Sequence, residues 1–597
     1  MSSQSCWLKA SPTHTQTMKS PSIIYNQFSL LGSLFVCLLS LPPAYAADDD
    51  RETGKSVLSF AALSNRPLAA PLPPLGWNTW DSFARNIDEK TVREMADAMV
   101  SSGMKDAGYE YIVIDDYWEN GRVPRTGSGE DPRAGRDSQG RLLADASRFP
   151  DGMKALADYV HSKGLKFGIY TSPGDSTCGC NTASFGSEET DIKTFAEWGV
   201  DFLKLDGCGT PEKAEVVLAR WRALIDGLDR PMVLSVNISR DFALTRRYAE
   251  MWRTTTDLMP VFEYSPGQLH LGESICSVID HQVGLEGYSG GGHWNDPDML
   301  QVGNGGLTLE QNRAHFGMWA ILGAPLIAGN DLRSMTTEIR DILINPEVLA
   351  IDQDPAGREG YLVLRPTNKL QVWVKPLQKC DQMAIALFNP SSAPVTYDLP
   401  LTRLGVRGDA FIRDVFAHQD LGLKRGEFAI TVPAGGAKLF KVSTHEFLTP
   451  PVAYVVPPLD FSKGPVRIEA EDESAVCFYS GYTTNGLSEF SGEGYVQGAK
   501  SWQWFSLMFD VSIAKAGNYL CSFRYQNPGP GLLEYKFNGI PVALESTKPG
   551  EWKVATVAFF LKAQMNRLRL GSPNQDKNEV AIDYCEIRPA QTNAYAK

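Results

Sequence analysis

The chain has 597 residues, of which 43% are hydrophobic and 21% are charged, and its formal net charge is -13 at pH 7. This length exceeds what a single hydrophobic core organises, so we expect two to four domains, and the ordinary composition excludes a largely disordered chain. The acidic charge disfavours nucleic acid and anionic membranes as partners and favours a neutral substrate.

Residues 1–46 have the pattern of a cleavable signal peptide. Lys9 and Lys19 precede a 14-residue apolar run, Phe28 to Leu41, and Ala44-Tyr45-Ala46 is a small-residue cleavage site. The run is too short to span a bilayer, so we expect a secreted or periplasmic protein without a membrane span. Cleavage shifts the charge from -13 to -15 and leaves eight cysteines, too few for a disulfide scaffold. Residues 47–70 are predicted to be a linker.

Between residues 71 and 356, strand-like and helix-like patterns alternate eight times. The Thr210-Pro211 pair is predicted to open one of the helices, with a cap followed by proline at the first helical position. Eight alternations over about 280 residues predict a (β/α)8 TIM barrel, and an open doubly wound sheet is the alternative. The predicted strands are Leu75–Trp80, Tyr111–Ile114, Lys166–Tyr170, Phe202–Asp206, Met232–Asn237, Glu250–Thr255, His293–Met299 and Pro325–Ala328.

The fourth of these strands carries two charged residues on one face. Lys204 and Asp206 lie two residues apart, so their side chains point the same way, and Asp206 is the strand's last residue. A carboxylate at the carboxyl end of a parallel strand projects into the region where such sheets bind ligands. Burying two charges is costly, so we expect a nucleophilic or acid/base carboxylate; the alternative is an ion pair that only specifies strand register.

Further acids, tryptophans and cations fall at or just beyond the other strand ends. Carboxylates accept hydrogen bonds from hydroxyl groups, and indole rings stack on the apolar face of a pyranose, so this combination predicts a sugar site. Glycoside hydrolysis needs two carboxyl groups, and retention requires a separation of roughly 5 to 6 Å. Asp206 and Asp257, two strands apart, are compatible with that separation. The residues gathered at this edge are Trp77, Trp80, Asp115, Asp116, Lys204, Asp206, Arg253, Asp257, Asp296 and Asp298.

Seven further motifs occur in order between residues 74 and 360. They are L-G-W-N-T-W at 75, I-D-D-Y-W at 114, G-L-K-F-G-I-Y at 164, W-G-V-D-F-L-K-L-D-G-C at 198, M-W-R-T-T-T-D at 251, W-N-D-P-D-M-L at 294 and A-P-L-I-A-G-N-D at 324. Together these motifs, in this order, resemble glycoside hydrolase family 27, the α-galactosidase family. The resemblance implies a (β/α)8 barrel followed by an antiparallel β domain, and release of terminal α-D-galactose from oligo- or polysaccharides with retention and without a cofactor.

The resemblance also implies a role for individual residues. Asp206 is expected to be the nucleophile and Asp257 the acid/base. Asp115 and Asp116 are expected to receive the C4 and C6 hydroxyls, and Trp77 to form an apolar wall, although both tryptophans at this edge also fit a plain core. The remaining implied residues are Lys204, Arg253 and Asp298, which are expected to bind sugar hydroxyls, and Cys178 and Cys208, which are expected to form a disulfide.

One segment departs from the family pattern. Where many α-galactosidases have Cys-Glu-Trp after the fifth strand, this chain has Val236, Asn237 and Ile238. The change removes a carboxylate and an indole from the side of the site that faces C2 of the sugar. An α-N-acetylgalactosaminidase or a β-L-arabinopyranosidase is therefore the alternative enzyme, and a non-catalytic glycan-binding protein is the alternative from another class. The oligomeric state stays open.

After residue 357 the pattern becomes short and alternating, which predicts an antiparallel β-sandwich domain over 357–447. A proline-rich linker is predicted over 448–463 and a second β-sandwich over 464–592. This last segment contains V-R-I-E-A-E-D at 466, S-G-Y at 480, G-Y-V at 494 and A-G-N-Y at 516. With these motifs it resembles jelly-roll carbohydrate-binding modules of families 6, 35 and 36, which implies a structural calcium near Glu469 and Glu471. Trp502 and Trp504 fit a core more readily than a glycan site.

Overall fold

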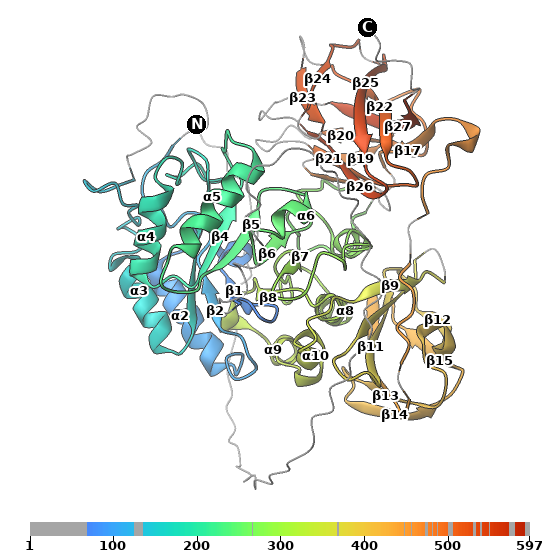
Figure 1. Cartoon of the computed structure of the whole chain (residues 1–597), viewed down its shortest axis with the longest axis horizontal. Coiled ribbons are helices and arrows are strands. Elements are labelled where there is room, and N and C mark those ends of the chain that lie inside the picture. The colour runs from blue at the N-terminus through green and yellow to red at the C-terminus, as the bar shows by residue number, and fades with distance from the viewer. Residues whose placement is uncertain are drawn as a thin grey trace, which may run out of the picture. The chain divides into compact units, whose positions relative to one another are not determined.

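The computed structural model describes residues 68–123, 135–265, 267–366, 369–446, 448–454, 457–471, 476–479, 481–485, 487–498, 506–528, 533–537, 540–548, 550–571 and 580–590 (Figure 1). The predicted signal peptide, residues 47–67 of the predicted linker, and both Trp502 and Trp504 lie outside these residues. Within them, no helix has the length and apolar character needed to cross a membrane.

The first part of the described chain forms one eight-stranded parallel sheet, as predicted. The order is β7-β6-β5-β4-β3-β2-β1-β8, and each neighbouring pair is parallel. Beyond β7, Leu300 forms a parallel bridge to Ala328 of β8. The strands are β1 (Leu75–Asn78), β2 (Tyr111–Val113), β3 (Lys166–Thr171), β4 (Phe202–Asp206), β5 (Val233–Asn237), β6 (Met251–Arg253), β7 (Trp294–Asp296) and β8 (Leu326–Ala328).

Both faces of this sheet are buried, which explains why its strands are almost continuously apolar. On one face Phe202 and Val233 belong to a small cluster with side chains from other strands, and on the other face Leu203 and Leu234 join the large core shared with the helices. The period-two alternation of a strand places Lys204 and Asp206 on the Phe202 face. The two charged residues therefore lie on the face away from the helices.

Helices connect the strands. Asp88 caps α2 by accepting a hydrogen bond from Thr91 N, and Thr308 and Gln311 form a capping box on α8. The predicted helix start at Thr210-Pro211 is wrong, because α5 begins at Ala214 and Thr210 and Pro211 lie outside any helix. The helices are α1 (Trp80–Phe83), α2 (Glu89–Ser101), α3 (Gly152–Ser162), α4 (Glu188–Trp198), α5 (Ala214–Asp226), α6 (Phe242–Thr245), α7 (Ile275–Asp280), α8 (Leu309–Leu322), α9 (Thr337–Leu343) and α10 (Pro346–Asp352).

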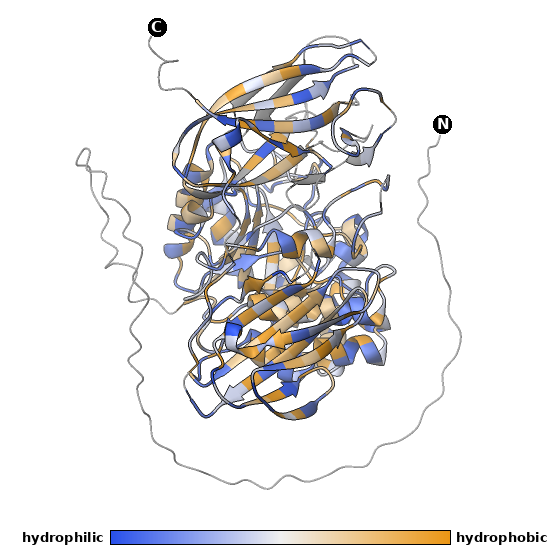
Figure 2. Cartoon of the chain, turned by 90° about the vertical axis from the view of Figure 1, so that its right-hand side faces the viewer, coloured by the Kyte–Doolittle hydropathy of each residue, from blue (hydrophilic) through white to orange (hydrophobic). Residues whose placement is uncertain are grey.

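Antiparallel sheets follow, as the change of pattern predicts, and hydrophobic residues recur along their strands (Figure 2). One sheet has the order β14-β13-β16-β11-β10-β9, and β12 pairs with β15. Helix α8 packs against β16, where Gly317 leaves room for the Phe416 ring. The strands are β9 (Tyr361–Leu364), β10 (Gln371–Pro376), β11 (Gln382–Asn389), β12 (Val395–Pro400), β13 (Ala410–Asp414), β14 (Gln419–Lys424), β15 (Glu427–Val432) and β16 (Gly436–Thr444).

The C-terminal part contains two more antiparallel sheets that share one core. Phe509 of β21 and Phe523 of β22 meet in it, with ring centroids 6.0 Å apart. The strands are β17 (Val466–Glu469), β18 (Val476–Tyr479), β19 (Gly481–Thr484), β20 (Tyr495–Gly498), β21 (Ser506–Ile513), β22 (Gly517–Gln526), β23 (Leu533–Phe537), β24 (Ile540–Leu544), β25 (Lys553–Leu561), β26 (Gln564–Gly571) and β27 (Ala581–Pro589).

Candidate active site

Asp206, at the end of β4, lies in a cluster of charges. Lys204 donates to Asp115 Oδ2 at 2.7 Å. Burial lowers the pKa of Lys204, but the carboxylates of Asp115 and Asp206 outweigh this and raise it above its usual value, so the ammonium stays charged. Burial raises the pKa of Asp206 to about 6, opposed by Lys204 and reinforced by the negative charge of Asp257. At neutral pH Asp206 is therefore ionised and able to act as a nucleophile.

Asp115 and Asp116 follow β2 and are both buried. Asp115 Oδ1 accepts from Asp116 N, while its Oδ2 accepts from Asn78 Nδ2 and Lys204 Nζ. Asp116 Oδ1 takes three donors, and its Oδ2 takes one, Gly179 N at 2.6 Å. Asp115 Oδ1 and Asp116 Oδ2 each keep a free lone pair, which is the acceptor capacity that a sugar hydroxyl needs.

Arg253, the last residue of β6, joins two further carboxylates. Its Nη2 lies 2.7 Å from Asp298 Oδ2 and 3.2 Å from Asp257 Oδ1. The Asp257 side chain is 54% exposed, whereas that of Asp298 is buried. Asp298 has φ of +89°, a costly conformation for a residue with a side chain and one often found at functional sites. The accessible Asp257 carboxyl is therefore the one placed to exchange protons with a substrate or water.

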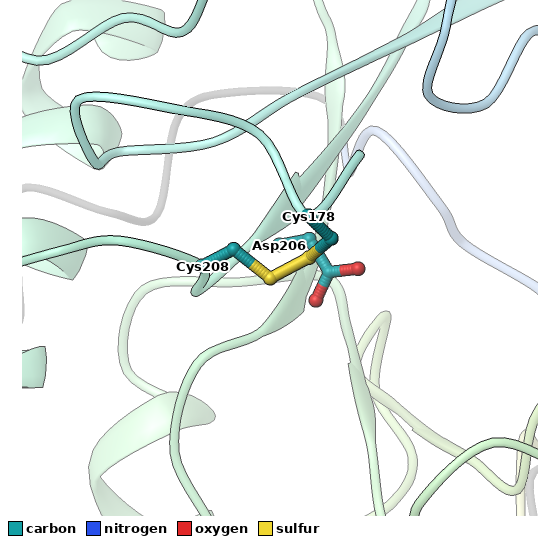
Figure 3. Close-up of side chains that lie close together, drawn as sticks. All are labelled: Cys178, Asp206 and Cys208. Carbon is teal, nitrogen blue, oxygen red and sulfur yellow. A yellow bond between two sulfur atoms is a disulfide. The ribbon is translucent and has the colours of Figure 1, made fainter. Parts of the chain in front are cut away.

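A disulfide joins Cys178 and Cys208, as the resemblance implied, with Cα atoms 5.2 Å apart. Figure 3 shows the bridge beside Asp206, and its sulfurs and a carboxylate oxygen lie within 4.8 Å of one another. Among the described residues this is the single such group of three potential metal ligands, but the sulfurs are bonded to each other rather than ionised. The bridge fixes the loop after β3 against the loop after β4. Cys180, also on the former loop, is a free, partly exposed thiol.

The structure does not support the expected apolar wall at Trp77. This residue is 0% exposed, packs edge-on against Phe83, and donates its indole N–H to Asn330 O at 2.8 Å, so it has no face for a sugar. Trp80, in α1 just beyond the strand, is partly exposed and stacks on Tyr117. Of the two tryptophans near β1, Trp80 is therefore the one that a ligand can reach.

The segment that departs from the family pattern follows β5. Asn237 pairs in register with Asp206 of β4, so it lies beside the nucleophile candidate. Arg240 Nη1 donates to Asn237 Oδ1 at 3.0 Å, and its Nη2 donates to Thr255 O at 2.6 Å. An amide and a guanidinium thus occupy the edge between β5 and β6. This is the segment in which the sequence lacks the carboxylate and the indole of the family pattern.

Two further residues line this cluster without having been singled out from the sequence. Tyr170, at the end of β3, is buried, and its ring lies 5.6 Å from Lys204 Nζ. Asp81, in α1, has its Oδ2 buried without a hydrogen-bond partner, and burial together with the Asp298 charge raises its pKa well above the usual value. Asp296, by contrast, accepts from Asp298 N and acts as a turn residue. Its position near the carboxyl end of β3 is the signal that could have identified Tyr170.

A second carboxylate cluster lies in the C-terminal part. Glu471 Oε1 accepts from the backbone N–H groups of Glu493 and Gly494, while its Oε2 is buried without a hydrogen-bond partner. Burial raises the pKa of Glu471. Glu469 accepts from Ser491 Oγ, and Asp583 on β27, which the sequence reasoning missed, accepts from Ser491 N at 2.8 Å. Oxygen is the ligand type that calcium prefers, and these three carboxylates would have to draw together around an ion, since their ligand atoms do not all lie within 4.8 Å of one another here.

The fold and the arrangement of the site together indicate the class of enzyme. A parallel β/α sheet whose carboxyl edge gathers a half-buried carboxylate, an exposed carboxylate and acids with spare acceptor capacity is a glycoside hydrolase scaffold. Residues 72–354 match the family model described as "Alpha galactosidase A", and residues 367–442 match "Alpha galactosidase C-terminal beta sandwich domain".

Several α-galactosidases are similar to this chain in sequence or in structure. α-Galactosidase A of Cellvibrio japonicus is 38% identical over 391 residues, which cover 63% of this chain and 92% of that protein. α-Galactosidase of Cyamopsis tetragonoloba is 37% identical over 62% of this chain and 85% of its own length. The crystal structure of α-galactosidase I from Mortierella vinacea superposes with a TM-score of 0.58 at 32% identity, covering 64% of this chain and 99% of that one. The chain therefore belongs to glycoside hydrolase family 27, the α-galactosidase family.

Proposed function

We propose that this α-galactosidase is an exported, retaining enzyme that releases terminal α-D-galactose, with Asp206 as nucleophile and Asp257 as acid/base. The observation that carries the proposal is the contrast between the two carboxyl groups. Asp206 is half-buried beside Lys204, whereas Asp257 is exposed yet close enough for its charge to raise the pKa of Asp206. Retaining glycosidases need two carboxyl groups within reach of one bond but in different environments.

The reaction takes two displacements. In the first, an Asp206 carboxylate oxygen bonds to the anomeric carbon while the glycosidic C–O bond breaks, and Asp257 gives its proton to the departing oxygen. In the second, a water oxygen attacks the same carbon, its proton passes to Asp257, and Asp206 leaves as a carboxylate. Two inversions return the original anomer, and the overall reaction consumes one water molecule.

The galactose configuration is supported by the acceptors on the β2 side of the site. Asp115 Oδ1 and Asp116 Oδ2 each have one lone pair left, and both groups are held rigidly by their other hydrogen bonds. We assign them the C4 and C6 hydroxyls. Lys204, Arg253 and Asp298 would take hydroxyls nearer the nucleophile. On the β5 side, Asn237 and Arg240 would face C2, in place of the family's carboxylate.

We also infer the finer architecture. The Leu300–Ala328 bridge brings the segment after β7 to β8, which supports closure of the parallel sheet into a (β/α)8 barrel over 71–356. The antiparallel sheets support a β-sandwich domain over 357–447 and, after the linker at 448–463, a carbohydrate-binding module over 464–592. Export follows from the signal-peptide pattern of residues 1–46, with the periplasm or the exterior as destination.

A calcium ion would fit the C-terminal module. Glu471 offers a buried Oε2 without a hydrogen-bond partner, and Glu469 and Asp583 add oxygen atoms around Ser491. Such an ion would cross-link β17 to β27 and stabilise the module, with no part in the hydrolysis. The active site itself is proposed to work without a cofactor.

The test measures initial rates on aryl α-galactoside, aryl α-N-acetylgalactosaminide and aryl β-L-arabinopyranoside, with the first-formed anomer read by proton NMR. We expect the α-galactoside to be preferred and α-galactose to appear first. Asp206→Asn should lower kcat by more than about a hundredfold, since loss of a nucleophile removes the covalent route. β-Galactose appearing first, or a variant above a hundredth of wild-type activity, would overturn the nucleophile assignment.

A further inference from the structure

Glu273 is a buried carboxylate outside the proposed sugar site, yet it is attached to the segment that carries Asp257. It lies just before α7, and 2% of its surface is exposed. Its backbone N–H donates to Asp257 O at 2.7 Å, and its carbonyl accepts from Met259 N at 2.8 Å. Residues 258 and 273 also form a parallel bridge. The backbone around Asp257 is thus held to Glu273 on both sides.

The Glu273 side chain adds a second attachment. Oε1 accepts from both the backbone N–H and the hydroxyl of Thr256, at 2.8 and 2.9 Å. Oε2 accepts from Ser277 Oγ at 3.1 Å and lies 2.9 Å from His281 Nδ1. Both of those partners belong to the α7 region, so the carboxylate ties the residue before Asp257 to a packed helix. Thr256 thus holds one oxygen of the Glu273 carboxylate, while Ser277 and His281 hold the other.

This attachment matters because the Asp257 side chain is itself loosely held. It is 54% exposed and contacts Arg253 Nη2 at 3.2 Å, a long distance for a charge-assisted hydrogen bond. The direction of its carboxyl group therefore depends on the backbone that carries it. Leu258 N donates to Asp298 Oδ2 at 2.8 Å, so residue 258 is fixed by a proposed substrate-binding residue. Residue 256 is fixed by Glu273 and by Arg253, which donates to its carbonyl.

We infer that Glu273 is a positioning residue, which holds Asp257 where it can donate its proton to the leaving oxygen. The inference rests on the proposed acid/base role of Asp257. A shift of about 1 Å in a reacting group can cost roughly a hundredfold in rate. The cost falls on substrates whose leaving group must be protonated, because an acidic phenol departs as an anion without help.

The experiment measures kcat/KM on aryl α-galactosides that range from dinitrophenyl to phenyl, at the pH optimum. Asp257→Ala is the reference for lost acid catalysis, and Glu273→Ala is the test variant. Glu250→Gln is the matched control. Glu250 is a partly buried carboxylate that also accepts a backbone N–H, Leu234 N at 2.8 Å, but it lies at the opposite end of β6. Thr256→Val, which loses one hydrogen bond to Glu273, replaces the test variant should Glu273→Ala not fold.

We expect Glu273→Ala to lose about 10- to 100-fold on the phenyl substrate and less than about fivefold on the dinitrophenyl substrate, with a smaller effect of the same kind in Thr256→Val. Glu273→Gln keeps one oxygen for Thr256 and should recover most of the loss. Glu250→Gln should resemble wild type. The inference is overturned if Glu273→Ala loses kcat/KM equally on every substrate, or loses none, while Asp257→Ala still discriminates between leaving groups. An Asp257→Ala variant that does not discriminate overturns the acid/base role as well.

Discussion

Replacing the proposed nucleophile by asparagine should stabilise the protein at neutral pH. Burial raises the pKa of Asp206 to about 6, whereas an aspartate in an unfolded chain titrates near 3.9. A difference of about 2 pH units corresponds to about 3 kcal/mol of free energy by which the folded state disfavours the ionised group. Because the side chain is only half-buried, solvent screening reduces this to roughly 1 to 2 kcal/mol. Asparagine keeps the shape and removes the charge.

The gain should depend on pH in a defined direction. Below about pH 4 the carboxyl group is protonated in both the folded and the unfolded chain, so it costs nothing. Between about pH 4 and 6 the unfolded chain releases its proton first, and wild-type stability falls as the pH rises. Above about pH 6 the penalty is complete. Asp206→Asn should therefore match wild type near pH 4 and exceed it at pH 7.

Thermal unfolding at pH 4 and pH 7 measures this difference. A gain of about 1 to 2 kcal/mol should raise the Tm of the parallel β/α domain by roughly 3 to 6 °C at pH 7. Asp257→Asn should give a smaller gain, because the Asp257 side chain is 54% exposed and the substitution removes only its contribution to the raised pKa of Asp206. A variant that melts at or below the wild-type temperature at pH 7, or whose advantage persists unchanged at pH 4, would refute the reasoning.

Two further predictions follow from the charged groups. Below about pH 6, kcat/KM should fall about tenfold per pH unit, because the proposed nucleophile Asp206 must be ionised to attack. Lys204→Met should move this acid limb to higher pH, because Lys204 lowers the pKa of Asp206. The pH-rate profiles of both enzymes test this, and an unmoved limb in the variant would contradict it. If calcium binds the C-terminal module, a chelator should lower the Tm of its unfolding transition and added calcium should restore it. Glu471→Gln should unfold at the Tm of the chelator-treated wild type, with or without calcium. Calorimetry measures these transitions, and a wild-type Tm that does not change with chelator would argue against a bound ion.

The placement of Asp206 was predictable because it depends on local rules. A short apolar strand between two glycines, with charges at alternate positions, determines which face the charges occupy and at which end the carboxylate lies. The same rules failed for the tryptophans. Trp77 and Trp80 are three residues apart in one motif, and only packing decides that Trp77 is enclosed by Phe83 and the segment at Asn330. That contact joins residues more than 200 positions apart, so no local pattern contains it.

Glu273 was missed for a similar reason. It follows a long connection after β6, and nothing in its immediate neighbours marks it as different from any surface glutamate before a helix. Its partners Thr256, Ser277 and His281 become neighbours when the connection returns to the strand end. The Thr210-Pro211 error is different, because a cap and a proline were present but the helix begins three residues later, at Ala214.

The arrangement of charge would also let the proposed pair of carboxylates serve both displacements. Before the first step Asp206 carries a negative charge beside the charge of Asp257, which raises the pKa of Asp206. In the proposed mechanism, formation of the galactosyl ester removes the charge from Asp206. An anionic Asp257 then no longer faces that neighbouring anion, while Arg253 lies beside it at 3.2 Å. The proton that Asp257 would give up in the first displacement would thus leave the carboxylate that acts as the base in the second.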